Sequence, residues 1–153
     1  MTDPSEQDRP FLGRGWSFPP DFHPGGVRML SGEDDILSSL HVLLSTARGE
    51  RIMVPHYGCN LDELMFENLD TRMRTLVADK IATAILYHEP RITLEQVRVG
   101  PDLRDALDGR VLIEVVYRVK ATNSRFNVVF PYYRDEGIDL NITTDVRLLP
   151  EAP

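Results

Sequence analysis

Several acidic side chains in this chain have a spacing found in catalytic carboxylate pairs. Glu63 and Glu67 are four residues apart in the segment LDELMFENL, and Asp70 follows closely. A helix there would place both glutamates on one face. A glycoside hydrolase, however, needs two carboxylates across a sugar-binding cleft, one of them with a raised pKa. Two acids on one short helix are more often a solvated surface, and nothing beside them indicates aromatic side chains that would stack on a sugar.

The cysteine and the histidines give little support for a nucleophile or a metal site. Cys59 follows His56 by three residues, but no third residue is evident to orient the histidine, and a lone cysteine usually packs as a small hydrophobic side chain. The four histidines are scattered, without HExxH or paired cysteines. The glycines of GRGW precede prolines instead of a helix, which argues against a phosphate loop. We therefore expect no catalytic residue, no metal and no cofactor.

The segment YHEPRI raises a question about charge. Glu89 follows an apolar helical pattern, although the C-terminal end of a helix dipole favours cations. Pro90 disfavours helical backbone at Glu89, so the helix should end there. Water, Arg91 or another protein could satisfy the charge of Glu89. An exposed pair within the chain would contribute little stability, whereas an interfacial pair provides specificity.

Composition limits the class of protein to which these residues belong. The 153 residues carry a formal net charge of −7, and the pI is about 5.0. This balance argues against broad nucleic-acid binding and against docking on anionic membranes. No apolar run approaches the roughly 20 residues of a spanning helix, and MTDPSEQDRP does not resemble a signal peptide. With one cysteine, the sequence indicates a soluble cytoplasmic protein without membrane insertion.

Residues 1–10 are polar and predict a disordered arm. Residues 11–26, FLGRGWSFPPDFHPGG, are called the aromatic strap below; their glycines and prolines predict an irregular segment. The strap has too much aromatic surface to remain in water, so we expect it to pack on its own core or on a neighbour. Its large hydrophobic residues are Phe11, Leu12, Trp16, Phe18 and Phe22.

Two helices are predicted from capping residues and apolar periodicity. Ser31 and Asp34 have the spacing of a capping box, and Gly49 is the expected stop of the first helix. Asp70 should cap the second, which ends before Pro90. Between them we expect an extended segment at RIMVP, a turn at HYGCN and a brief helix at LDELMFENL. The apolar faces comprise Ile36, Leu40, Leu43, Leu44 and Ala47, and then Met73, Leu76, Val77, Ile81, Ala84 and Ile85.

The second half of the chain is rich in β-branched residues and predicts strands at RITLEQVRV, RVLIEVVYRVKA and RFNVVFPYY. Their order and short turns predict an antiparallel meander. The expected fold is α+β, with two to three helices packed on one face of a small antiparallel sheet. Residues 11–133 would form a single domain. Residues 134–153 would be an extension whose DVRLL is an edge strand or a strand donated to a neighbour.

The order of the motifs resembles that of the baseplate wedge family of contractile injection machines, which includes sheath-initiating phage tail proteins, a type VI secretion baseplate subunit and proteins of extracellular contractile particles. The matching segments are GRGWSFP, then EDDILSSLHVLLSTARGERIMVPHYGCNLDELMFENLD, then YHEPRITLEQVRV. The resemblance spans Gly13 to about Phe130. It implies a structural protein in a sixfold baseplate, with wedge core proteins, sheath subunits and spike or tube-hub proteins as partners. It also implies assembly in the cytoplasm and a place in a virion-like or secretion particle.

The resemblance also assigns roles to residues. The family's Glu-Pro-Arg docking element for the wedge core falls on Glu89, Pro90 and Arg91, which would satisfy their charges with a neighbouring protein. Sheath assembly would begin by strand addition to an open edge within 111–120 or 125–130. The strand residues concerned are Val111, Ile113, Val115, Tyr117, Val128 and Phe130.

Two other functions stay open. The family is often labelled lysozyme-like, so the alternative function is a peptidoglycan hydrolase that uses two of Glu63, Glu67 and Asp70. A free-standing regulatory binding module is a third possibility.

Overall fold

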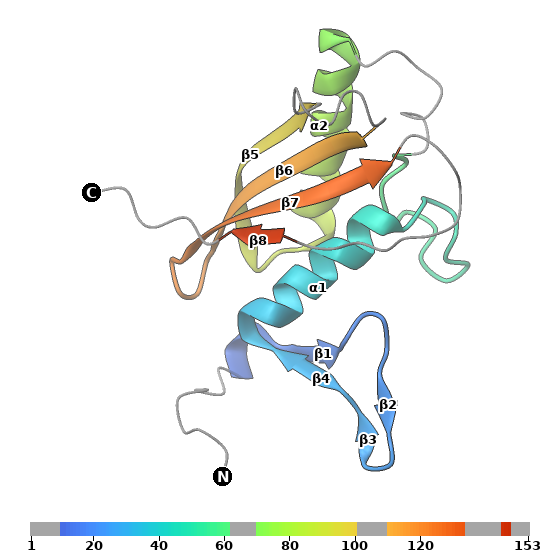
Figure 1. Cartoon of the computed structure of the whole chain (residues 1–153), viewed down its shortest axis with the longest axis vertical. Coiled ribbons are helices and arrows are strands. Elements are labelled where there is room, and N and C mark those ends of the chain that lie inside the picture. The colour runs from blue at the N-terminus through green and yellow to red at the C-terminus, as the bar shows by residue number, and fades with distance from the viewer. Residues whose placement is uncertain (1–9, 62–69, 101–109, 134–144, 148–153) are drawn as a thin grey trace.

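The computed structural model of the chain describes residues 10–61, 70–100, 110–133 and 145–147 (Figure 1). They form an α+β fold, as the sequence predicts, with two α-helices against a four-stranded antiparallel sheet and a separate strap of short strands. No helix in these ranges is long and apolar enough to span a membrane. The elements are η1 (Pro10–Leu12), β1 (Arg14–Trp16), β2 (Phe22–His23), β3 (Gly26–Val27), β4 (Met29–Ser31), α1 (Gly32–Ser45), α2 (Thr71–His88), β5 (Ile92–Gly100), β6 (Arg110–Val119), β7 (Arg125–Tyr133) and β8 (Asp145–Arg147).

The core lies between the helices and one face of the sheet. Because side chains alternate along a strand, every second residue of β6 points toward the helices. Val111, Ile113, Val115, Tyr117 and Val119 are all at most 2% exposed. They pack with buried residues of both helices and of β7: Ile36, Leu40, Leu43, Leu44, Val77, Ile81, Ala84, Ile85, Val128 and Phe130.

The start and the end of α1 differ from the prediction. Ser31 is the N-cap residue, but its side chain makes no capping hydrogen bond. Instead, the backbone N–H of Gly32 donates to the carbonyl of Gly13 in the strap (3.3 Å), so strand pairing satisfies part of the helix end. The helix ends at Ser45, before Gly49, because Thr46 turns to extended backbone while its Oγ1 donates to the Val42 carbonyl (2.6 Å). The predicted capping box and glycine stop are therefore wrong.

Helix α2 follows the prediction at both ends. The side chain of Asp70 accepts a hydrogen bond from the Met73 N–H (2.7 Å), and the helix ends at His88, two residues before Pro90. Leu76, which the periodicity placed on the buried face, is 45% exposed. RIMVP forms turns instead of an extended segment, and most of the predicted LDELMFENL helix lies outside the described residues.

The strand order β5-β6-β7-β8 places β6 inside the sheet, with β5 paired along one side and β7 along the other. The expectation of an open edge within 111–120 is therefore wrong, because the main-chain groups of β6 are already used on both sides. Strand β7 pairs with β8 at Asn127, Val128 and Val129. The extension thus supplies an edge strand to its own sheet, one of the two alternatives for DVRLL.

The outer edge of β5 is the long free edge in the described part of the chain. This strand has nine residues and is paired with β6 alone among the described strands. A β-bulge between Leu94 and Gln96 makes Glu95 an extra residue in the ladder and turns its side chain to the outer face of the sheet. Edge strands commonly carry bulges and charges that prevent random pairing.

The aromatic strap is more regular than its glycines and prolines predict. Strand β1 pairs with β4 and β2 pairs with β3, and the resulting extended arm projects away from the four-stranded sheet (Figure 1). The strap aromatics do not pack into the core; only Leu12 does, at 1% exposed. Trp16 and Phe22 meet edge to face, with ring centroids 6.1 Å apart, and Phe18 meets His41 at 5.6 Å. Phe11, Trp16, Phe18 and Phe22 are between 47% and 69% exposed.

Candidate docking site

The turn after α2 buries an acidic side chain. The backbone N–H of Glu89 completes the last turn of α2 by donating to the Ile85 carbonyl (2.9 Å). The side chain then points inward and is only 2% exposed, whereas Pro90 remains exposed. A carboxylate buried to this degree needs a partner, because leaving it unpaired costs several kcal/mol, on the order of the desolvation penalty.

Arg91 is that partner. Its Nε donates to Oε1 of Glu89 at 2.6 Å and its Nη2 donates to Oε2 at 2.7 Å, so the guanidinium holds both carboxylate oxygens. This parallel geometry is the strongest form of an arginine–carboxylate interaction. Since Pro90 alone separates the two residues, its fixed backbone angle sets the distance between them.

The other side of the guanidinium reaches two further elements. Nη1 of Arg91 donates to Oδ2 of Asp35 in α1 at 2.6 Å, and to the carbonyl oxygen of Leu12 in η1 at 2.9 Å. Four of the five N–H groups of Arg91 are thus directed at these acceptors. One residue thereby joins α1, the strap and the start of β5.

Two glycines allow the strap to pass this close. A Cβ on Gly15 would collide with Oδ1 of Asp35, and a Cβ on Gly13 would lie 3.3 Å from Nη1 of Arg91. Gly13 also has a φ of +89°, which side-chain-bearing residues rarely adopt. The segment GRG is therefore required by the ion pair beneath it and not by a phosphate.

The electrostatics of the site follow from this arrangement. The hydrogen bonds that Arg91 donates to the Glu89 carboxylate raise the pKa of Arg91. Burial opposes this rise, and the hydrogen bond to Asp35 adds to it. Burial raises the pKa of Tyr117, and the negative charges of Glu33 and Glu89 raise it further. Burial also raises the pKa of Tyr57. The positive charge of Arg51 lowers this pKa, and the negative charge of Glu89 raises it. Both phenols therefore remain protonated at neutral pH.

The structure corrects the sequence interpretation of Glu89 and Arg91. Their charges are not left for a neighbouring protein, because they satisfy each other and Asp35 within the chain. A partner could reach the exposed ring of Pro90 and the quarter of the Arg91 side chain that is accessible, 26%. Asp35, Gly13 and Gly15 were missed as part of this site. The close spacing of the two glycines before Trp16 was the available signal.

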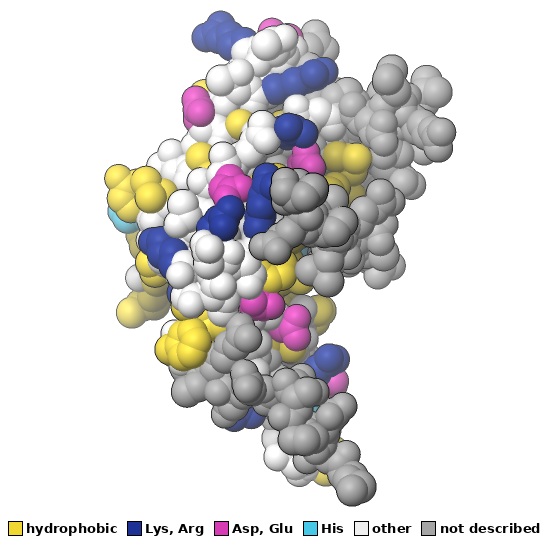
Figure 2. All heavy atoms as spheres, turned by 90° about the vertical axis from the view of Figure 1, so that its left-hand side faces the viewer, with side chains coloured by type: hydrophobic (Ala, Val, Ile, Leu, Met, Phe, Trp, Pro, Cys, Tyr) yellow, Lys and Arg dark blue, Asp and Glu magenta, His cyan; other side chains and the backbone are white. Residues whose placement is uncertain are grey.

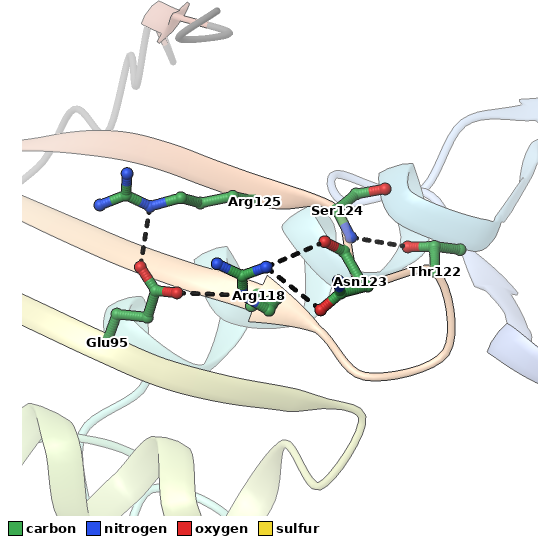
Figure 3. Close-up of polar contacts among 6 residues, drawn as sticks. All are labelled: Glu95, Arg118, Thr122, Asn123, Ser124 and Arg125. Carbon is green, nitrogen blue, oxygen red and sulfur yellow. Dashed lines mark hydrogen bonds and ion pairs between the residues drawn. The ribbon is translucent and has the colours of Figure 1, made fainter. Parts of the chain in front are cut away.

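A second polar cluster lies on the outer face of the sheet. Glu95, at the bulge of β5, accepts from Nε of Arg118 on β6 at 3.1 Å and from Nε of Arg125 on β7 at 2.8 Å (Figure 3). Arg118 also donates to the side-chain oxygen of Asn123 in the following turn, at 3.1 Å. Figure 2 shows Lys or Arg and Asp or Glu side chains interspersed across the middle of one face. These exposed pairs tie three strands together but contribute modestly to stability.

The candidates for chemistry are not assembled into a reaction centre in the described part of the chain. Burial raises the pKa of Cys59 to about 11, so its thiol is protonated. The backbone carbonyl of His56 lies 3.2 Å from Nε2 of His88. Asp70 caps α2, and Glu63 and Glu67 lie outside the described residues. No group of three potential metal ligands occurs among the residues described.

Comparison with known proteins places this chain in a family of baseplate wedge proteins. The model of the family described as baseplate wedge protein gp25 matches residues 30–124, and the chain belongs to this family. The gp25 baseplate wedge protein of Enterobacteria phage T4 is 34% identical over 70 residues, which cover 46% of this chain. The match covers 53% of the T4 protein, so the chain spans about half the length of that relative.

Solved structures extend the similarity. A Geobacter sulfurreducens protein with the provisional name tail lysozyme is 42% identical with a TM-score of 0.64, covering 71% of this chain and 97% of that one. A chain of the sixfold-symmetrised baseplate of the anti-feeding prophage is 35% identical with a TM-score of 0.66, covering 71% and 86%. A chain of the post-contraction baseplate of pyocin R2 is 27% identical with a TM-score of 0.53, covering 66% and 98%.

Proposed function

We propose that this chain is a non-enzymatic baseplate subunit of a contractile, phage-tail-like machine, which docks on the wedge core and starts sheath assembly by strand addition. Family membership supports the baseplate role, since relatives of similar fold occur in the anti-feeding prophage and pyocin R2 baseplates. The observation that carries the docking role is the turn at Glu89, Pro90 and Arg91. Its charges are fixed by internal bonds, while Pro90 and part of Arg91 remain accessible.

The internal ion pair changes how docking would work. A docking turn whose charges are already paired presents a rigid shape instead of an open charge. Preorganisation of this kind reduces the ordering cost of binding. The remaining N–H of the Arg91 Nη2 has no acceptor among the described residues and could donate to a partner carbonyl or carboxylate.

Strand addition is best supported at β5. Its outer edge is the long free edge among the described strands, and an incoming strand would bond to its main chain. Thr93, Gln96 and Arg98 are exposed along this strand, and with the bulge at Glu95 they would set the register of the partner strand.

The docking role is tested by the double variant Glu89→Ala, Arg91→Ala and by Pro90→Ala, each introduced into the complete machine. Baseplates or sheathed particles should fail to assemble, as seen by electron microscopy, while the purified variants stay folded by circular dichroism. Arg72→Ala, an exposed change in the first turn of α2 and away from both proposed contacts, is the control and should assemble normally. Normal sheathed particles from the Pro90 variant and the double variant would refute the docking role.

Strand addition is tested by a photo-crosslinking residue at Gln96 on β5 and, as a control, at Ala121 in the turn after β6. Both positions are exposed. Irradiation of assembled particles should link position 96, and not position 121, to the sheath subunit. A crosslink from the control alone would move the sheath contact away from β5.

The name of the Geobacter sulfurreducens relative keeps one alternative open, a peptidoglycan hydrolase. The purified chain, incubated with cell-wall sacculi, would then release soluble fragments, and Glu67→Gln would abolish the release. We expect no turnover above background, since Asp70 is occupied as a helix cap.

A further inference from the structure

The loop between α1 and Cys59 exposes aliphatic side chains at its tip. Ile52 is 92% exposed and Met53 is 90% exposed, and Val54 after them is 48% exposed. Loop tips usually carry glycine, proline or small polar residues, which suit turn backbone and water. Single exposed hydrophobic residues are common on protein surfaces, but a consecutive group of them marks an interaction site.

The tip is held in place from within the loop. The N–H of Gly49 donates to the Pro55 carbonyl at 2.8 Å, and the N–H of Arg48 donates to the side-chain oxygen of Asn60 at 3.0 Å. Gly58 has a φ of +113°, and a Cβ there would collide with the carbonyl oxygen of Thr46. Hydrogen bonds therefore hold the base of the loop whose tip exposes Ile52 and Met53.

A stack of rings joins the loop to the end of α2. The guanidinium carbon of Arg51 lies 4.4 Å from the centroid of the Tyr57 ring, which meets the His88 ring edge-on at 5.0 Å. The chain neighbours of the two outer members of this stack are exposed hydrophobic residues. Ile52 follows Arg51, and Tyr87 precedes His88.

We define the loop–helix patch as Ile52, Met53, Val54, Leu86 and Tyr87; the last two are each 75% exposed.

The charge around the patch is opposite to that of the whole chain. The chain carries −7 with histidine counted as neutral, yet two arginines, Arg48 and Arg51, lie in the loop that carries Ile52, Met53 and Val54. The one carboxylate in the loop, Glu50, accepts a hydrogen bond from the Ala47 N–H at 2.9 Å. Arg51 donates no hydrogen bond to a described residue, so its N–H groups are available to a partner carboxylate. A complementary partner would be apolar and acidic.

We propose that the loop–helix patch binds an acidic amphipathic α-helix of the wedge core. Its apolar residues at i and i+4 would lie between the loop tip and the end of α2, and a neighbouring carboxylate would bind Arg51. The inference rests on the proposed docking function, which it extends by a second surface and by the chemistry of the partner. The two surfaces adjoin, since Tyr87 and His88 at the end of α2 directly precede Glu89 in the chain.

The experiment measures binding of the full-length chain to wedge-core assemblies purified from the same machine in a strain that lacks this chain. Ile52→Asp with Met53→Asp, and separately Leu86→Glu with Tyr87→Glu, should each weaken binding at least tenfold without lowering the melting temperature. Leu76→Glu, on the same helix but away from the patch, is the control and should bind as wild type. Arg51→Glu should also weaken binding, and added salt should weaken wild-type binding.

The outcomes separate this inference from the docking role. Patch variants that bind like wild type, while Glu89→Ala with Arg91→Ala loses binding, overturn the patch and leave the docking turn. The reverse result supports the patch and refutes the turn, and a wild-type chain that does not bind refutes both. A patch covered by residues 62–69 or by a second copy would also overturn the proposal. Lower melting temperatures of the patch variants would indicate that residues 62–69 cover the patch. A wild-type dimer that the patch variants fail to form would indicate that a second copy covers it.

Discussion

Nη1 of Arg91 donates to Oδ2 of Asp35 at 2.6 Å and so joins the start of the sheet to α1, 56 residues earlier in the chain. The same nitrogen donates to the Leu12 carbonyl, which fixes the strap to both elements. The turn that we propose to dock is therefore part of the framework of the fold. A change that weakens it would act on the strap and on α1 as well as on docking.

Removing Arg91 alone should destabilise the chain strongly. Arg91→Met leaves the carboxylate of Glu89, at 2% exposed, without its partner. We expect a loss of about 3 kcal/mol in the free energy of unfolding, toward the low end for a broken buried pair because Arg91 is partly exposed. Urea unfolding measures the loss. Glu89→Gln combined with Arg91→Met should cost less than Arg91→Met alone, since no charge is then left unpaired.

The control for this change is Arg98→Met. Arg98 pairs with Glu114 at 3.5 Å and its side chain is 65% exposed, so the loss should stay within about 1 kcal/mol. Equal losses for Arg91→Met and Arg98→Met would contradict the structural role of the buried pair.

Gly15→Ala should detach the strap from α1. The new methyl group would collide with Oδ1 of Asp35, which Arg91 holds in place, so either the strap or the ion pair must move. We expect a loss of about 1–3 kcal/mol, typical of overpacking. Gly100→Ala is the matched control, because a methyl group at that position would have no described atom within 4 Å beyond its chain neighbours. Thermal unfolding compares the two, and a neutral Gly15→Ala would show that the strap packs less closely than described.

The sequence predicted those parts of the fold that local patterns determine. Asp70 and Pro90 bound α2 as their capping and backbone preferences require, and the alternation in 110–119 identified β6. The order of strands could not be deduced this way, because alternation shows which face of a strand is buried and not which strands lie beside it. Val111 and Tyr117 were accordingly assigned to a possible edge, although β6 is central.

Local sequence patterns were limited in the same way at the turn formed by Glu89, Pro90 and Arg91. Helix-end electrostatics identified Glu89 as an anomaly, and Arg91 was considered as its partner. The expectation of a weak pair assumed exposure, whereas Leu12, Asp35 and the two glycines enclose the pair in the folded chain. Burial of this kind depends on residues 56 and 79 positions away, which no local pattern contains.

Cys59 should be unreactive in the folded chain. Its side chain is buried, with Sγ 3.9 Å from the Lys80 carbonyl, and burial raises its pKa to about 11. Because the thiolate is the reactive form, modification by a thiol reagent near pH 8 should be slow. The same reagent should react rapidly once guanidinium chloride unfolds the chain. Fast labelling of the native protein would show that the segment around Cys59 opens readily.

Glu95 should titrate at a lower pH in the folded chain than in the unfolded chain. Hydrogen bonding from Arg118 is the largest cause of the lowered pKa, and the charge and hydrogen bond of Arg125 add to it. A group with a lowered folded pKa stabilises the fold above its unfolded pKa, and that contribution disappears as pH falls through the folded value. The advantage of wild type over Glu95→Gln should therefore shrink as the pH drops below about 4.5, the ordinary pKa of glutamate. NMR titration of the Glu95 carboxylate measures the pKa directly. Arg118→Met should raise it toward the unfolded value, whereas Arg98→Met, on the same face of the sheet, should leave it unchanged.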